Sequence, residues 1–122
     1  MGHSRTSVQY IPVVLERPLL PLMNDTKWDE LRLAMHGIEP GPQWSTIDRD
    51  TGYRNDPDGD WFYHFRIGRY ETILYVDIAT PSVQQREAVR IALTAIHVPG
   101  EETDGGFRVY GYVAEGQAVG YI

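Results

Sequence analysis

The chain has 122 residues, no cysteine, and 17 acidic against 11 basic side chains, for a formal net charge of -6. This length fits one domain with one core, and the lack of cysteine excludes disulfides, thiolate nucleophiles and zinc sites built on thiolates. Because the charge is negative and the arginines are spread along the chain, we expect no nucleic-acid partner. The apolar runs are too short and too broken for a signal peptide or a membrane span, so the sequence predicts a cytoplasmic protein.

The segment 1–22 differs in composition from the rest of the chain. Its stretch "VQYIPVVLERPLLPLM" contains three prolines among aliphatic residues, which excludes a helix and favours an extended edge strand or a polyproline-like arm. The motif "PLLP" is either a ligand for proline-binding domains or a segment packed on the protein's own body. We therefore predict a Pro-rich arm at 1–22 and one α+β domain at 23–122. In an alternative interpretation, Met23 is the natural start and the arm derives from upstream sequence.

A helix is predicted at 24–36, where "NDTKWDELRLAMH" has acids in its first turn and is followed by Gly37, a good terminating residue. The candidate caps of its first turn are Asn24, Asp25 and Thr26. Its apolar stripe consists of Trp28, Leu31 and Met35, and such a stripe is typical of core packing. After prolines 40 and 42, the alternation in "QWSTID" predicts a strand at 43–48, with Trp44 and Thr46 on one face and Ser45 and Ile47 on the other.

Two aromatic segments, "DWFYHFRI" at 60–67 and "ETILYVDIA" at 71–79, flank a short connection at Gly68 and Arg69. Their aromatic and β-branched residues predict an antiparallel hairpin. With a two-residue loop, the pairs on the core face are Trp61 with Val76, Tyr63 with Leu74, and Phe65 with Thr72.

A second, longer helix is predicted at 80–97, with Thr80 as its N-cap and Pro81 at its first helical position. Its apolar positions are Val83, Val89, Ala92, Leu93 and Ile96. The segment 98–106 is predicted to be an exposed acidic loop, followed by a strand at 107–113 and a short extended tail at 118–122. This order predicts a mostly antiparallel sheet of four or five strands with two helices packed on one face.

The stretch "DPDGD" at 56–60 begins like a calcium-binding loop but fails as one. An EF-hand needs glycine at its sixth position and glutamate at its twelfth, where this chain has Trp61 and Ile67. The tetrapeptide "DPDG" is typical of a turn, and a turn is the prediction. The alternative is an irregular cation site, whose candidate ligands are Asp48, Asp50, Asp56, Asp58 and Asp60.

His64 is a candidate base, since histidine titrates near neutral pH and Asp77 or Glu71 lies on the same predicted face. The alternative is a half-exposed strand histidine among aromatic residues, which is the interpretation we favour. No nucleophile elbow, phosphate-binding loop, helical zinc pair or dinucleotide fingerprint is present. We therefore predict no catalytic residue, no metal ligand and no cofactor.

The second face of the predicted sheet carries many rings. Its residues are Phe62, His64, Ile73, Tyr75, Tyr110 and Tyr112. Because leaving so many rings in water would be unfavourable, we expect this face to be covered by the arm, by a second subunit or by a ligand. A mixture of tyrosine and histidine is typical of an interaction surface.

Three stretches, "NDTKWDELRLAM", "PQWSTIDRDTGY" and "DGDWFYHFRIGRYETILYVDI", resemble a family of small bacterial proteins of unknown function. That family opens with a tryptophan-bearing helix and contains a "W-F-Y-H-F" strand. The resemblance covers about 23–80 and leaves out the arm. It implies a stand-alone protein, in some members carried on mobile elements, and supplies no activity or site.

These features support two functional hypotheses. In the first, the protein is a non-catalytic binding or interaction protein that uses the aromatic face and the acidic loops, as a homodimer or as an immunity-like partner of another protein. In the second, it is a small metal-dependent hydrolase or ligand-binding enzyme that uses His64 with Asp77, or the acidic loops with a divalent ion.

Overall fold

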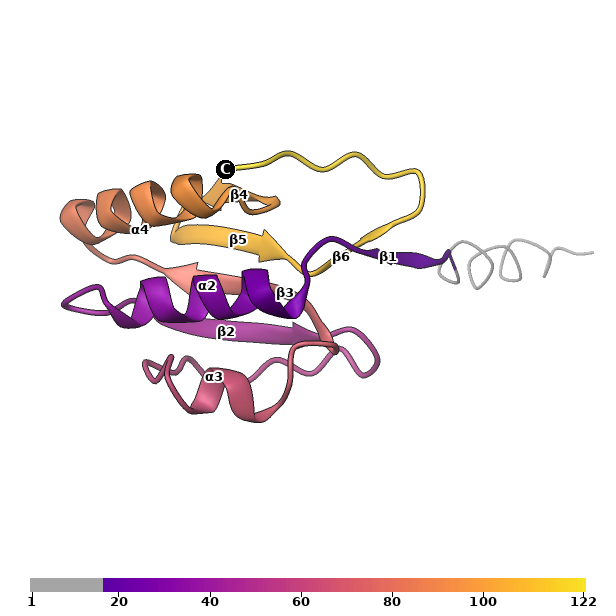
Figure 1. Ribbon diagram of the computed structural model, residues 1–122, viewed down its shortest axis with the longest axis horizontal. Helices are drawn as coiled ribbons and strands as arrows, with labels where there is room; N and C mark the ends of the chain where they lie inside the picture. The colour runs from indigo at the N-terminus through magenta and orange to yellow at the C-terminus, as the bar shows by residue number, and fades with distance from the viewer. Residues whose placement is uncertain (1–16) are drawn as a thin grey trace, which may run out of the picture.

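The computed structural model describes residues 17–122, and Figure 1 shows their arrangement. In chain order the elements are β1 (Leu19–Pro21), α2 (Asp25–His36), β2 (Gln43–Asp48), α3 (His64–Ile67), β3 (Ile73–Ala79), α4 (Val83–Ile96), β4 (Gly100–Thr103), β5 (Gly106–Tyr110) and β6 (Tyr112–Ala114). Four strands form an antiparallel sheet in the order β2-β3-β5-β4, and β1 pairs with β6 in a separate ribbon. The predicted α+β class is confirmed. Within the described residues, every helix is too short or too polar to span a membrane.

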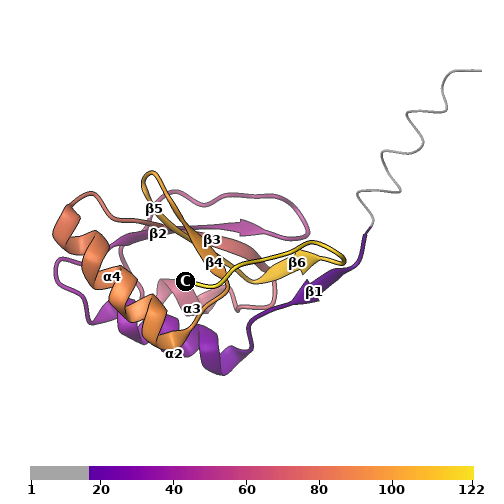
Figure 2. The ribbon, with the colours of Figure 1, turned by 90° about the horizontal axis from the view of Figure 1, so that it is seen from above.

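The two long helices lie on the same face of the sheet, as Figure 2 shows. Helix α2 begins at the predicted cap, since the Asn24 side chain accepts a hydrogen bond from the Lys27 amide at 2.8 Å. It ends at Gly37, and its predicted stripe is buried. On the sheet, the side chains that meet the helices are Val76, Ile78, Phe107 and Val109, all at most 1 % exposed. The core therefore lies between one sheet face and the two helices.

Helix α4 begins two residues later than predicted. Ser82 is the cap, because its hydroxyl accepts a hydrogen bond from the Gln85 amide at 3.0 Å. The predicted cap, Thr80, is buried just after β3, and Pro81 lies outside the helix. Val83, predicted to be on the apolar face, is 81 % exposed at the start of the helix.

The predicted hairpin of 60–67 with 71–79 is wrong. The partners of β3 are β2 and β5, and residues 61–67 form a turn followed by the short helix α3. Trp61 and Phe65 are 2 % and 3 % exposed, but Tyr63, predicted to lie on the same core face, is 63 % exposed. Phe65 is central to an aromatic cluster, with ring centroids 5.0 Å from Trp44 and 4.8 Å from Trp61.

Local hydrogen bonds explain why this segment coils. The Asp58 carboxylate accepts from the Asp60 amide at 2.7 Å, and the Asp60 carboxylate accepts from the Tyr63 amide at 3.0 Å. Such aspartate bonds to amides two or three residues ahead compete with a sheet ladder. Trp61 and Phe65 are four apart and would share a face in a helix or in a strand, but a strand would also bury Tyr63 between them, and Tyr63 is exposed.

The C-terminal third contains three strands where one strand and an extended tail were predicted. The acidic loop predicted at 98–106 contains β4, and the strand predicted at 107–113 is divided at Gly111 into β5 and β6. A Cβ added at Gly111 would lie 2.1 Å from the Ile73 carbonyl oxygen, so the backbones approach there as only glycine allows. After β6 the chain turns back, and the tail makes a bridge between Tyr121 and Pro99.

The described part of the arm agrees with the predicted edge strand. Leu19, Leu20 and Pro21 pair with Ala114, Val113 and Tyr112. The "PLLP" motif therefore packs on the protein's own β6, and residues 1–16 of the arm lie outside the described part of the chain.

Candidate functional site

The sheet face opposite the helices carries the candidate site, and strand register determines its composition. Tyr75 and Asp77 of β3 pair with Tyr110 and Arg108 of β5, and Arg108 pairs in turn with Glu101 of β4. Paired residues lie on the same face of a sheet. Three neighbouring strands therefore bring two tyrosines, two carboxylates and an arginine together.

A cation occupies one half of this face. The Arg108 guanidinium donates to both Asp77 carboxylate oxygens, at 2.7 and 3.0 Å, and lies 4.0 Å from the centre of the Tyr75 ring. Arg54, from the loop after β2, also donates to Asp77 at 3.2 Å. The hydrogen bonds that Arg108 donates to Asp77 raise the pKa of Arg108. This arginine is thus held as a fixed cation by a carboxylate and a ring face.

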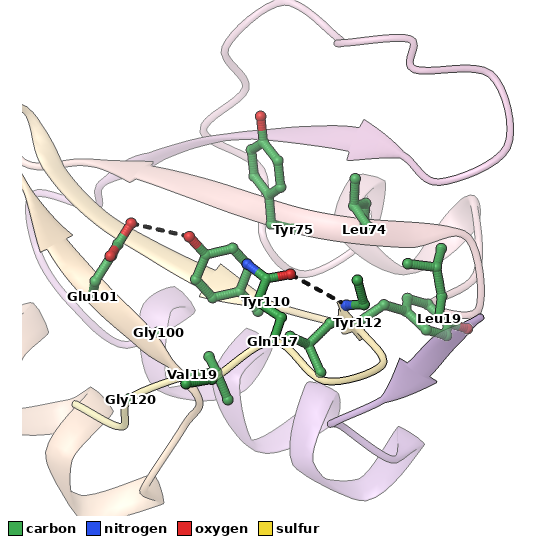
Figure 3. Close-up of a pocket in the computed structure, with 13 residues that line it drawn as sticks. Leu19, Leu74, Tyr75, Gly100, Glu101, Tyr110, Tyr112, Gln117, Val119 and Gly120 are labelled. Carbon is green, nitrogen blue, oxygen red and sulfur yellow. Dashed lines mark hydrogen bonds between the residues drawn. The ribbon is translucent and has the colours of Figure 1, made fainter. Parts of the chain in front are cut away.

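The other half of the face borders a pocket of about 460 Å³, shown in Figure 3 and called here the tyrosine pocket. Its floor is the sheet, and its walls are the β1–β6 ribbon and residues 117–120. The side chains that line the pocket include Leu19, Leu74, Tyr75, Glu101, Tyr110, Tyr112 and Val119. The pocket exists because Gly111 ends β5, so that β6 and the arm leave the main sheet.

Within the tyrosine pocket, the Tyr110 hydroxyl donates to the Glu101 carboxylate at 3.0 Å. Burial and this bond to a carboxylate raise the pKa of Tyr110, so the phenol stays protonated at neutral pH. Glu101 is the one ionised side chain among the described residues that line the pocket. The site is therefore an apolar and aromatic pocket with a single negative charge.

The six residues predicted to form one aromatic face are not brought together. Tyr75, Tyr110 and Tyr112 line the tyrosine pocket. Ile73 is 5 % exposed in the core, on the helix side, and Phe62 and His64 lie in the turn and in α3, outside the sheet. The reason is that the predicted hairpin does not form. Phe62 and His64 were assigned to this face only because they were expected to lie in a strand.

Sequence reasoning missed Glu101, Arg108 and Leu19. Glu101 lay in the predicted loop, although its place between Gly100 and the glycine turn at 105–106 is a hairpin signal. Arg108 alternates with Phe107 and Val109 in β5, which marks it as facing away from the core. No local signal indicates that Leu19 lines a pocket, because β1 is distant in sequence from its partners.

The hydrolase hypothesis required His64 to contact Asp77, and in the structure it does not. Its Nδ1 lies 2.8 Å from an Asp58 carboxylate oxygen, and its Nε2 lies 3.6 Å from an Asp60 carboxylate oxygen. The "DPDGD" stretch is irregular, with Asp58 bridging to Trp44 of β2, and the turn comes after it, at 61–63. Within residues 17–122, no group of three histidine, aspartate or glutamate side chains is arranged to hold a metal ion.

The His64 contacts predict a pH dependence. The hydrogen bond to Asp58, its charge and that of Asp60 raise the pKa of His64 above 6.5. A histidine whose pKa is raised by folding stabilises the fold fully below its unfolded pKa, and this contribution is lost as pH rises through the folded pKa. We expect the melting temperature of the wild type, minus that of His64→Gln, to fall as the pH rises above about 6.5, the usual pKa of histidine. Proton NMR titration of His64 checks the cause, because Asp58→Asn should lower its pKa. A difference in melting temperature that is flat with pH would contradict the contact.

The comparisons with known proteins give one match. A family model described as "Family of unknown function (DUF6678)" matches residues 10–116. The match extends beyond the resemblance at 23–80 in both directions and includes residues 10–22, so the view that the arm lies outside the family is wrong for that part. No curated protein and no solved structure matches the chain.

Proposed function

The chain belongs to the family of unknown function DUF6678, and from the geometry of its sheet face we propose that it is a binding protein. The tyrosine pocket is its ligand site. The observation that carries this proposal is the pocket itself, about 460 Å³ and lined by residues of β1, β3, β4, β5, β6 and the C-terminal tail. A volume in this range suits a small ligand.

The chemistry of the lining favours binding over catalysis. Rings and aliphatic side chains provide contact area, while Glu101 is the single ionised group among the described lining residues. General acid and base catalysis or nucleophilic attack needs a base placed against a second reactive group. Among the described lining residues the one such pair is Glu101 with the Tyr110 hydroxyl, and the raised pKa of Tyr110 makes it a poor nucleophile. His64, with its two aspartates, is in α3 and does not line this pocket.

A fragment screen by amide NMR tests the proposal, using neutral, cationic and anionic compounds on the full chain. We expect compounds to shift the amide signals of Gly100 and Gly120, which line the pocket. Val119→Trp, placed in the pocket wall, should abolish these shifts because the larger ring fills the space. The matched control is Val83→Trp, which adds the same ring at an exposed position on α4 and should leave binding unchanged.

Two outcomes would count against a ligand pocket. The first is a screen in which no compound shifts Gly100 or Gly120. The second is a dimer in light scattering that becomes a monomer in Tyr110→Ser, since a second copy of the chain would then occupy the tyrosine pocket.

A further inference from the structure

The sheet face opposite the helices carries two pairs of side chains, each consisting of a tyrosine and a carboxylate. Tyr75 and Asp77 form the first pair, a ring beside a carboxylate, and Tyr110 and Glu101 form the second. The two rings meet edge to face, with centroids 6.1 Å apart. The two pairs are therefore neighbours on one surface, built from the same kinds of groups.

The first pair holds a cation against both its ring and its carboxylate. Among the described residues the second pair has no cation placed in this way, although Arg108 lies close enough to the Tyr110 hydroxyl to act on its pKa. Arg108 lies over Tyr75 and donates twice to Asp77. Within residues 17–122, by contrast, no basic side chain lies within 4.0 Å of the Glu101 carboxylate, and no arginine or lysine is stacked over Tyr110. Arg108, the cross-strand neighbour of Glu101, is directed to Asp77 instead.

The second pair faces the tyrosine pocket, as Figure 3 shows for the bond between Tyr110 and Glu101. A carboxylate with one hydrogen bond has acceptor capacity left, and a tyrosine face attracts cations. An anionic ligand would be repelled by Glu101, the one ionised lining residue of the described chain. Leu19, Leu74 and Val119 supply apolar surface beside this pair.

We propose that the tyrosine pocket binds a small organic cation, with its ammonium or guanidinium group between the Tyr110 ring and the Glu101 carboxylate. The apolar part of the ligand packs against Leu19, Leu74 and Val119. This inference rests on the proposed ligand-binding function and adds the chemical class of the ligand.

Three probes of similar shape and different charge test the class: 2-phenylethylammonium, 2-phenylethanol and 3-phenylpropionate. Each is titrated into the full chain while the amide signals of Gly100 and Gly120 are monitored. We expect the ammonium probe to bind more tightly than the neutral probe, by about fivefold or more, as for one partly exposed ion pair. The anionic probe should bind most weakly.

Substitutions test whether Glu101 is the source of the preference for the ammonium probe. Glu101→Gln should remove the preference for the ammonium probe, whereas Glu30→Gln, the same change at an exposed position of α2, should preserve it. Tyr110→Phe should keep most of the affinity because the ring remains, and Tyr110→Leu should lose it. A Glu101→Gln variant that still prefers the ammonium probe would overturn the assignment of the charge.

The outcomes separate this inference from the function on which it rests. Equal or tighter pocket binding of the neutral or anionic probe would overturn the cationic class and leave the ligand pocket standing. If none of the three probes and no compound of the fragment screen shifted the pocket signals, both would fail.

Discussion

Trp61→Ala is expected to destabilise the protein by about 3–5 kcal/mol, as for large aromatic side chains removed from a core. Trp61 is 2 % exposed and packs against Trp44 and Phe65. Its indole N–H also donates to the buried Pro42 carbonyl at 2.9 Å, so the substitution leaves an acceptor without its partner. Urea unfolding measured by far-UV circular dichroism gives the loss.

Tyr63→Ala is the matched control, because it distinguishes a strand from the turn and helix of the structure. Alternation in a strand would bury Tyr63 on the same face as Trp61, whereas it is 63 % exposed here. We expect Tyr63→Ala to change the free energy of unfolding by less than about 1 kcal/mol. Comparable losses for the two substitutions would argue for the strand and against α3.

Gly111→Ala is expected to cost about 3 kcal/mol, at the upper end of what overpacking costs. The added Cβ would lie 2.1 Å from the Ile73 carbonyl oxygen and 3.1 Å from Cζ2 of Trp28. A backbone oxygen cannot turn aside as a flexible side chain can, so β3 or β5 has to move. Because Gly111 is where β6 leaves the main sheet, amide signals along the tyrosine pocket should shift as well.

The control for this substitution is Gly59→Ala. Gly59 is exposed, has no atom within 4 Å of an added Cβ, and does not have a positive φ. Alanine there reduces the freedom of the unfolded chain, so stability should be unchanged or slightly higher. If Gly111→Ala were as harmless as Gly59→Ala, the close approach of β3 and Gly111 would be wrong.

The aromatic segment 60–67 shows how a local pattern misleads. Its ring-rich sequence favours a strand by composition. In the structure, however, aspartates 58 and 60 accept hydrogen bonds from the amides of residues 60 and 63, and Tyr63 is exposed between the buried Trp61 and Phe65. Both a strand and a turn followed by a helix can bury aromatic rings in this stretch, and amino-acid composition does not distinguish the two structures. The strand is excluded by the tertiary structure, because both edges of β3 are already paired, one with β2 and the other with β5.

Sequence patterns correctly predicted those features of the fold that have local causes. The cap at Asn24, the end of α2 near Gly37 and its buried stripe depend on bonds and spacings within one helix. The strand at 43–48 and its two faces result from alternation, and the α+β class results from the order of such segments.

The residues that form the site are brought together only by the tertiary structure. Asp77, Glu101 and Arg108 lie on three different strands. The register of those strands determines which of the two carboxylates accepts the hydrogen bonds of Arg108. Leu19 enters the tyrosine pocket because β1 pairs with β6, almost a hundred residues along the chain. Strand pairing joins residues that no local pattern connects, and the free energy that selects one pairing comes from the core on the other face of the sheet.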